Sequence, residues 1–159
     1  MSDAKTRILF VCMGNICRSP AAENVMRSLI AAEGVEDKFE LDSAGTIDLH
    51  TGKSPDDRMG DALRNRGIAS AGKARQVKPG DFETFDWIFA MDEDNYQDLL
   101  TVRERAGQPT AKLVKFCDFC EEFDVSDVPD PYYGGLDGFE LVLDILEDGC
   151  AALLKKFNK

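Results

Sequence analysis

The strongest constraint on the fold lies in the first twenty residues, where an apolar run leads into a loop of small and polar residues. The β-favouring residues 8–11 predict a short buried strand. Gly14 and Asn15 tolerate positive φ angles, so the chain can turn there. Ser19 suits a helix N-cap and Pro20 the first helical position, which predicts a helix from this point. The loop N–H groups and the helix N-terminus would then converge on one point, and such a point binds anions.

Cys12 and Arg18 give this predicted anion site a possible chemistry. A thiolate is the reactive form of cysteine, and a helix N-terminus or a nearby cation favours it. Arg18 carries a planar guanidinium that can bind two phosphate oxygens at once. The alternative for Cys12 is an inert residue of a buried strand. The residue types around it, in this order at a strand-to-helix turn, favour a nucleophile beneath a bound phosphate.

Composition limits the classes of protein to consider. The chain has 159 residues, of which 43% are hydrophobic and 31% charged, as expected of one globular domain spanning 1–159. A net charge of −11 argues against nucleic-acid or anionic-membrane partners. The N-terminus has no apolar signal region, and no apolar stretch is long enough for a bilayer. The five cysteines are an odd number, which favours reduced thiols. We therefore expect a cytoplasmic monomer with no metal or cofactor.

Strand and helix patterns alternate along the rest of the chain. Strands are predicted at 8–11, 39–44, 87–91 and 112–116, and helices from Pro20 to Gly34, from Pro55 to Arg66, from Asp92 to Ala106 and after Gly138. This alternation predicts an α/β fold: a four-stranded parallel sheet with helices on both faces and the phosphate-binding loop after the first strand.

Three polar residues fall at the carboxyl ends of predicted strands. Cys12 ends the first strand, Ser43 lies near the end of the second, and Asp92 follows the third. Ligands of parallel α/β sheets bind beyond the carboxyl ends of the strands. We therefore expect these three residues to lie on one rim of the molecule.

Asp130 is a candidate general acid. A phosphate that leaves a phenol or an alcohol needs a proton on the departing oxygen, which Cys12 cannot supply. Asp130 stands between two prolines, in a stiff segment that continues into Tyr132 and Tyr133. The residue types alone favour an ordinary surface turn.

The nine residues Cys-Met-Gly-Asn-Ile-Cys-Arg-Ser-Pro at 12–20 resemble the signature loop of the low-molecular-weight protein tyrosine phosphatases. Asp-Pro-Tyr-Tyr-Gly at 130–134 resembles the family's general-acid loop. Four more segments are similar to the family in the expected order: 42–46, 54–58, 73–76 and 90–95. The resemblance covers nearly the whole chain. It implies a metal-independent hydrolase that acts on phosphotyrosine in proteins and on small aryl phosphates, and releases inorganic phosphate.

The resemblance also implies a role for each matching residue. Cys12 would attack phosphorus and carry a phosphocysteine, Arg18 would clamp the phosphoryl oxygens, and Asp130 would act first as acid and then as base. Asn15 would hold the loop curled with help from Ser43. The residues implied for the loop and for substrate binding are Met13, Gly14, Asn15, Ile16, Cys17, Ser19, Ser43, Leu49, Tyr132 and Tyr133.

Two further residues near the loop have implied or alternative roles. Ser19 would donate a hydrogen bond to the Cys12 sulfur and make it a better leaving group in the second step. Asp92 either supports the loop or simply caps the helix that follows it.

Specificity for the phosphorylated side chain is expected to depend on residues that line the predicted substrate-binding cleft. Leu49 on one side and Tyr132 or Tyr133 on the other would suit a long phosphotyrosine side chain. Members that act on phosphoarginine tend to have Thr where Ile16 stands, so Ile16 favours tyrosine. His50, the one histidine, is interpreted as an exposed loop residue.

The sequence departs from the family pattern at Gly72. Members often carry a histidine there that supports the loop through Asn15. In this chain the support must come from another residue.

The remaining cysteines suggest two further hypotheses. Cys17 could trap oxidised Cys12 as a disulfide and protect it from further oxidation; alternatively it is a small residue that merely fits. Cys117 and Cys120 have the spacing of half a zinc site, but only Cys150 and His50 could complete it. Apolar packing is the favoured interpretation of that pair.

Two other functions stay open. Arsenate reductases of this fold use a pair of relay cysteines between the second and third strands, and residues 70–90 contain no cysteine. A non-catalytic phosphopeptide-binding module would not need Cys12, Arg18 and Asp130 together. Nucleotide binding is disfavoured because neither glycine-rich nucleotide motif occurs.

Overall fold

A four-stranded parallel sheet forms the centre of the computed structural model, which describes residues 4–131 and 135–158. The strands are β1 (Thr6–Cys12), β2 (Phe39–Gly45), β3 (Trp87–Ala90) and β4 (Lys112–Lys115). Their spatial order is β2-β1-β3-β4, and each adjacent pair is parallel. The prediction of a four-stranded parallel sheet is confirmed.

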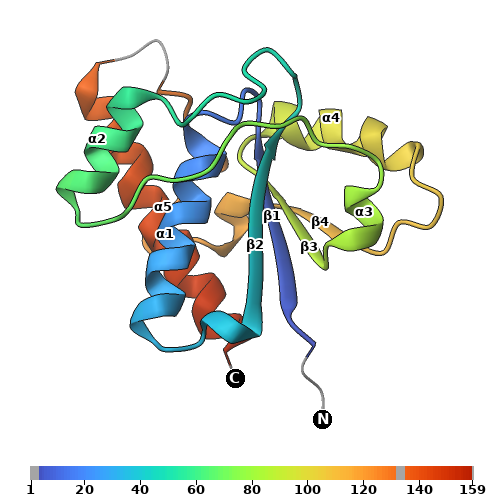
Figure 1. Cartoon of the computed structure of the whole chain (residues 1–159), viewed down its shortest axis with the longest axis horizontal. Coiled ribbons are helices and arrows are strands. Elements are labelled where there is room, and N and C mark those ends of the chain that lie inside the picture. The colour runs from blue at the N-terminus through green and yellow to red at the C-terminus, as the bar shows by residue number, and fades with distance from the viewer. Residues whose placement is uncertain (1–3, 132–134, 159) are drawn as a thin grey trace.

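Helices cover both faces of this sheet, as predicted. They are α1 (Arg18–Ala32), α2 (Asp57–Asn65), α3 (Asp81–Thr84), α4 (Glu93–Glu104) and α5 (Leu136–Phe157), with short 3₁₀ helices η1 (Glu36–Lys38) and η2 (Phe116–Phe119). In Figure 1, α1, α2 and α5 lie on one side of the sheet and α3 and α4 on the other. The connections from β1 through α1 to β2 and from β3 through α4 to β4 place all four strand ends at one edge.

Side chains of β1 divide between two apolar layers, because successive residues of a strand point to opposite faces. Ile8 and Phe10 pack in the layer formed with α1 and α5. Leu9 and Val11 pack in the layer that contains Phe82 of α3 and residues of α4. All four β1 residues are fully buried. The apolar run therefore forms a central strand rather than an alternating edge strand.

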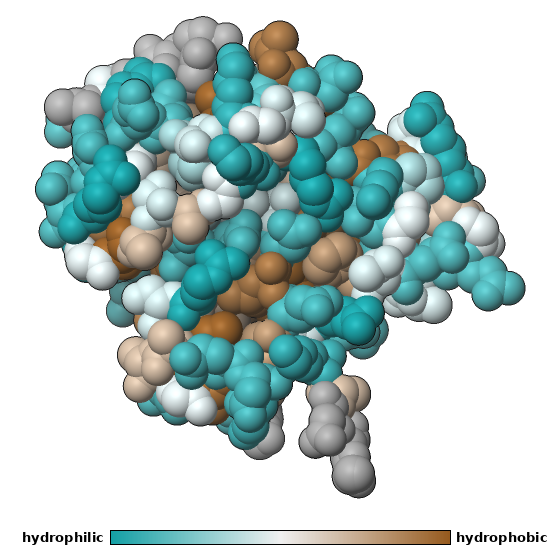
Figure 2. Space-filling view, viewed as in Figure 1, coloured by the Kyte–Doolittle hydropathy of each residue, from teal (hydrophilic) through white to brown (hydrophobic). Residues whose placement is uncertain are grey.

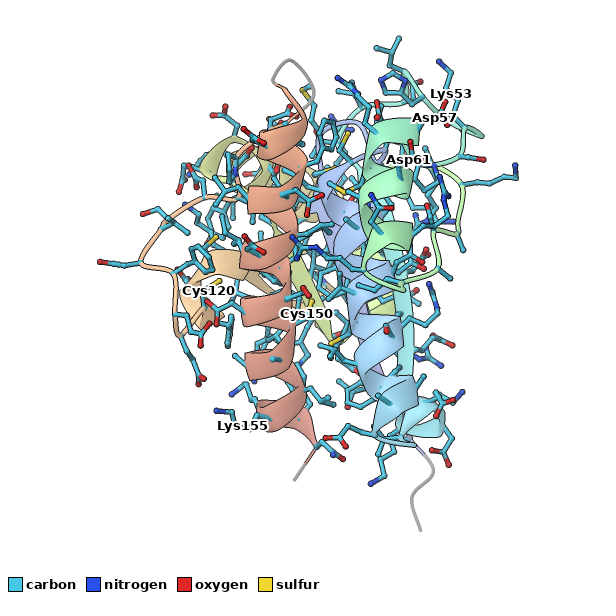
Figure 3. The ribbon with its side chains drawn as sticks, turned by 90° about the vertical axis from the view of Figure 1, so that its left-hand side faces the viewer. Lys53, Asp57, Asp61, Cys120, Cys150 and Lys155 are labelled. Atoms are coloured by element: carbon cyan, nitrogen blue, oxygen red, sulfur yellow. The ribbon has the colours of Figure 1, made fainter. Side chains whose placement is uncertain are left out.

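Helix α5 packs closely against its neighbours. A Cβ on Gly149 would lie 2.3 Å from the Phe116 ring, so only glycine fits at this crossing with η2. Cys150 lies where α5 faces α1, and its thiol points to the Ala22 carbonyl at 3.7 Å (Figure 3). Arg66, at the end of α2, binds three carboxylates of α5 at 2.7–3.0 Å; they belong to Glu140, Asp144 and Glu147.

Two predicted helix boundaries were wrong. Helix α1 begins at Arg18, with Cys17 at the N-cap, so Ser19 is inside the helix and does not cap it. The Ser19 hydroxyl instead faces Cys12 and Asn15. Helix α5 begins at Leu136 rather than after Gly138, because the Gly138 N–H already donates to the Gly135 carbonyl.

The visible surface is mostly hydrophilic, with a smaller area of apolar side chains near the centre of the view in Figure 2. In the part of the chain that the structure describes, no helix combines the length and apolarity needed to cross a bilayer.

Candidate active site

A pocket of about 130 Å³ opens at the carboxyl edge of the sheet, beside the loop that joins β1 to α1. Its walls come from that loop, from the segment after β2 and from the segment before α5. The lining residues are Cys12, Met13, Gly14, Ile16, Cys17, Arg18, Ile47, Leu49, His50 and Asp130. The proposed nucleophile and phosphate clamp, which are close together in the chain, therefore face one cavity with the proposed general acid Asp130, which is far from both in sequence.

The Cys12 sulfur lies at the inner end of the loop and is almost completely buried. It accepts a hydrogen bond from the Asn15 N–H at 3.3 Å and lies 3.0 Å from the Ser19 hydroxyl. Both contacts can stabilise negative charge on sulfur, because a hydrogen bond to a charged group is stronger than one between neutral groups. The site thus contains donors suited to a thiolate.

Asn15 controls the shape of the loop. Its φ angle is 58°, and it is the one non-glycine residue with positive φ in the described part of the chain. Its side-chain NH₂ donates to Ser19 Oγ at 2.8 Å and to Ser43 Oγ at 3.0 Å. Ser43 in turn donates to Glu23 at 2.7 Å. Gly14, in contrast, does not adopt the positive φ that the sequence allowed.

The loop backbone is anchored by the chain that follows β2. The Thr46 and Ile47 N–H groups donate to the carbonyls of Cys12 and Met13 at 2.9 and 3.1 Å. On the other side of the loop, the N–H of Asp56, the N-cap of α2, donates to the Ile16 carbonyl at 2.8 Å. These bonds use the outward carbonyls of the loop and hold it in one conformation.

Arg18 is buried at the first position of α1, and its guanidinium has acidic neighbours. Nη1 donates to Asp92 at 2.5 Å and to the Val128 carbonyl at 3.0 Å, and Nη2 lies 3.6 Å from Asp130. Burial alone would lower the pKa of Arg18, but the Cys12 sulfur and the Asp92 and Asp130 carboxylates outweigh burial and raise it. Arg18 therefore stays charged and has a fixed orientation at the pocket.

Asp130 is held near the pocket by the residues just before it. Val128, fully buried, donates its N–H to the Met91 carbonyl at 2.8 Å. Asp127 pairs with Lys115 at 2.6 Å and accepts the Glu93 N–H at 3.0 Å. The Asp130 side chain itself is 36% exposed, so it can meet both a bound substrate and solvent.

Asp92 performs both of the roles that the sequence left as alternatives. One carboxylate oxygen accepts the Asn95 N–H at 2.8 Å and caps α4. The other oxygen binds Arg18. A single side chain therefore joins the start of α4 to the phosphate loop.

The predicted specificity residues are divided between rim and interior. Leu49 is 70% exposed and Met13 is 42% exposed, both at the mouth of the pocket, whereas Ile16 is buried. His50 was expected to be an exposed loop residue, but it is only partly exposed and lies over the loop: a Cβ on Gly14 would be 3.0 Å from its ring. Tyr132 and Tyr133 lie outside the described residues.

The other cysteines differ in their surroundings. Cys17 lines the pocket, is buried, and has a raised pKa through burial and through the charges of Asp56 and Cys12. Cys117 and Cys120 lie at η2 and pack towards α5, away from the pocket. Among residues 4–131 and 135–158, no three His, Cys, Asp or Glu side chains are grouped to hold a metal ion.

Several residues that shape the site were not singled out from the sequence. The Glu23 carboxylate accepts a hydrogen bond from Ser43. The Arg75 N–H donates to Asn15, and the Val128 carbonyl accepts from Arg18. Their partners are distant in sequence, and each residue type is common on surfaces or in cores. Segments 73–76 and 42–46 resemble the phosphatases, but this resemblance did not indicate which residues would contact the loop.

Comparison with known proteins assigns the whole architecture to a family. Residues 7–159 match the family model described as low molecular weight phosphotyrosine protein phosphatase. The low molecular weight protein-tyrosine-phosphatase YfkJ of Bacillus subtilis is 44% identical over 96% of each chain. The low molecular weight phosphotyrosine protein phosphatase of Sus scrofa is 41% identical over 94% of each chain. A crystal structure of a protein tyrosine phosphatase from Entamoeba histolytica superposes with a TM-score of 0.90, at 46% identity and 97% coverage of both chains.

Proposed function

The chain belongs to the low-molecular-weight phosphotyrosine protein phosphatases, and from this premise we propose that Cys12, Arg18 and Asp130 hydrolyse phosphotyrosine through a phosphocysteine. The observation that carries the proposal is the shared pocket. Cys12, Arg18 and Asp130 all line it, and Arg18 Nη2 lies 3.6 Å from Asp130. A nucleophile, a phosphate clamp and a proton donor around one cavity are what phosphoryl transfer to a thiolate needs.

In the first step the Cys12 thiolate attacks phosphorus while Arg18 binds the non-bridging oxygens. The S–P bond forms as the P–O bond to the phenol breaks. Asp130, in its protonated form, gives its proton to the departing phenol oxygen. The products are an unphosphorylated tyrosine side chain in the substrate protein and a phosphocysteine on the enzyme.

In the second step water attacks the phosphocysteine. The Asp130 carboxylate, formed in the first step, removes a proton from that water as the new P–O bond forms and the S–P bond breaks. Ser19, 3.0 Å from the Cys12 sulfur, donates to the departing thiolate. Inorganic phosphate leaves, and the enzyme returns with Asp130 protonated and Cys12 ionised.

Aryl phosphates fit the pocket better than short alkyl phosphates. The Cys12 sulfur lies at the inner end of the cavity, and Leu49 and Ile47 provide apolar contact at the mouth. We expect a phenyl ring to reach from the rim towards the sulfur, whereas a phosphoserine side chain is shorter. We expect the protein substrate to meet a monomeric, cytoplasmic enzyme that needs no metal.

The test is hydrolysis of para-nitrophenyl phosphate in EDTA by wild type, Cys12→Ser and Asp130→Ala. We expect Cys12→Ser to be inactive. We expect the rate of Asp130→Ala to be about 10²–10⁴-fold lower, which is the usual contribution of a general acid to the rate. Asp124→Ala, an exposed carboxylate on the same segment and outside the pocket, is the matched control and should keep full activity. A folded, reduced wild type without activity would disprove the proposal, and arsenate reduction and phosphopeptide binding would be measured next.

A further inference from the structure

Arg75 lies outside the pocket and forms a bridge between two carboxylates. Its Nε donates to Asp42 at 3.2 Å, and its two terminal nitrogens donate to Asp81 at 3.0 and 3.2 Å. The Asp81 side chain is 4% exposed and that of Arg75 is 29% exposed, so this is a partly buried pair. Asp42 belongs to β2 and Asp81 to α3, so the Arg75 side chain fixes the extended segment around it to two elements.

The backbone of Arg75 faces the phosphate loop. Its N–H donates to Asn15 Oδ1 at 3.0 Å, and its carbonyl accepts the Gly45 N–H at 2.8 Å. Gln76, the next residue, forms a parallel bridge with Gly45. One residue therefore connects the end of β2 to the side chain that shapes the loop.

The Asn15 side chain accepts this hydrogen bond from Arg75. Its amide is bound at both ends, with Arg75 on the oxygen and Ser19 and Ser43 on the nitrogen. A non-glycine residue keeps a positive φ only when its surroundings enforce it. If the oxygen lost its donor, the amide could rotate away from Ser19, and Ser19 also contacts the Cys12 sulfur.

We propose that Arg75 is a positioning residue for the phosphate loop: its side chain clamps residues 74–76 between Asp42 and Asp81, so that its N–H holds Asn15 in the conformation that forms the anion site. The proposal rests on the proposed function, because it concerns the same site. It also answers the question raised by Gly72. That glycine has a φ of 108° and nothing within 4 Å of a Cβ built on it, and the support reaches Asn15 from Arg75 instead.

The first experiment compares Arg75→Met with Arg66→Met. Arg66 is a matched control, because it also binds several carboxylates, but on α5 and away from the loop. Arg75→Met should lower kcat about tenfold and weaken the binding of inorganic phosphate to a similar degree. Arg66→Met should lower the melting temperature and leave both quantities unchanged. Arg75→Lys should recover only part of the loss, because an ammonium group lacks the planar fork that reaches both carboxylates.

The second experiment tests the route through Asn15. Arg75→Met should change phosphate affinity less than twofold when Asn15→Ala is already present, because the N–H has then lost its acceptor. Asp42→Asn offers a milder change if Arg75→Met folds poorly, and should weaken phosphate binding about two- to threefold. It keeps the oxygen that accepts the Ser43 N–H.

Two results would overturn the inference. One is an Arg75→Met protein that loses thermal stability but binds phosphate and turns over like wild type. The other is a double variant of Arg75→Met and Asn15→Ala whose loss of phosphate affinity equals the product of the losses in the two single variants. Failure of the proposed function looks different: wild type would not hydrolyse aryl phosphates, yet phosphate binding would still depend on Arg75 through Asn15.

Discussion

The Arg18 guanidinium and the Asp92 carboxylate meet at 2.5 Å and join the first turn of α1 to the N-cap of α4. The two residues are 74 positions apart in the chain. Their pairing, with the hydrogen bond from Arg18 to the Val128 carbonyl, fixes the orientation of a guanidinium that lines the pocket. It also makes the stability of α4 and the orientation of the phosphate clamp depend on one side chain.

Replacing Asp92 should therefore affect stability and catalysis together. Asp92→Ala removes the helix cap, which costs about 1 kcal/mol, and leaves Arg18 with one acidic partner fewer. We expect it to reduce kcat/KM for an aryl phosphate at least tenfold. Asp92→Asn keeps a capping oxygen and should retain most of the stability while still losing activity. Urea unfolding and steady-state kinetics on the three proteins measure both effects, and an Asp92→Ala enzyme with normal kcat/KM would contradict this account.

Gly45 should be essential for the loop conformation. A Cβ at this position would lie 2.6 Å from the Met13 carbonyl oxygen and 3.1 Å from the Gly14 carbonyl carbon, both backbone atoms that cannot rotate away. We expect Gly45→Ala to weaken phosphate binding and lower kcat more than tenfold. Gly80→Ala is the control, because nothing lies within 4 Å of a Cβ there and Gly80 has a φ of −60°. Equal activity of the two variants would show that the loop can shift without loss.

Asp148 should make stability depend on pH in the acid range. Burial would raise the pKa of Asp148, but the N–H groups of Phe123, Glu121 and Glu122, at 3.0–3.1 Å, outweigh burial and lower it from 3.8. A carboxylate with a lowered pKa stabilises the fold above its unfolded-state pKa, and this contribution disappears as the pH falls through the folded-state value. Asp148→Asn should thus be less stable than wild type at pH 7, with a difference that shrinks below about pH 4.

Urea titrations of both proteins at several pH values measure this difference. Asp124→Asn serves as the control, because its carboxylate is exposed. A gap between wild type and Asp148→Asn that stays constant from pH 7 to about pH 3 would rule out the linkage.

Cys17 should protect the active-site sulfur from irreversible oxidation. Peroxide oxidises the Cys12 thiolate to a sulfenic acid, and the Cys17 thiol can then displace water from that sulfur to form a disulfide. Burial raises the pKa of Cys17, so it remains a thiol and is not the first cysteine attacked. We expect peroxide-treated wild type to regain activity in dithiothreitol and Cys17→Ser to regain little.

Mass spectrometry of the oxidised wild type should find a peptide that contains the 12–17 disulfide. Loss of activity that dithiothreitol cannot restore in wild type would disprove the protective role. Cys150→Ser is a suitable control, because Cys150 is buried between α5 and α1, away from the pocket (Figure 3).

The local order of elements could be read from the sequence because neighbouring residues specify it. The apolar runs at β1 and β3 and the break at Gly34 are local patterns, and each predicted its element. The boundary at Ser19 failed because the folded loop, and not the helix N-terminus, binds this side chain. Ser19 has the right chemistry for a helix cap, but Cys12 and Asn15 bind its hydroxyl instead.

Part of the proposed chemistry was also local, because the proposed nucleophile, the turn and the proposed clamp lie within residues 12–18, whereas Asp130 reaches the pocket only in the folded chain. The sequence by itself therefore determined the parallel α/β architecture, the phosphate loop and the residue types available for catalysis. Tertiary structure alone decided how that loop is held. Its supports arrive from Ser43, Arg75 and Asp92, which only the folding of the sheet brings within hydrogen-bonding distance. The strand pattern placed Ser43 and Asp92 on the rim beside the loop, but hydrogen bonds act over about 3 Å, so no pattern along the chain could reveal which atoms would meet or that Arg75 would join them.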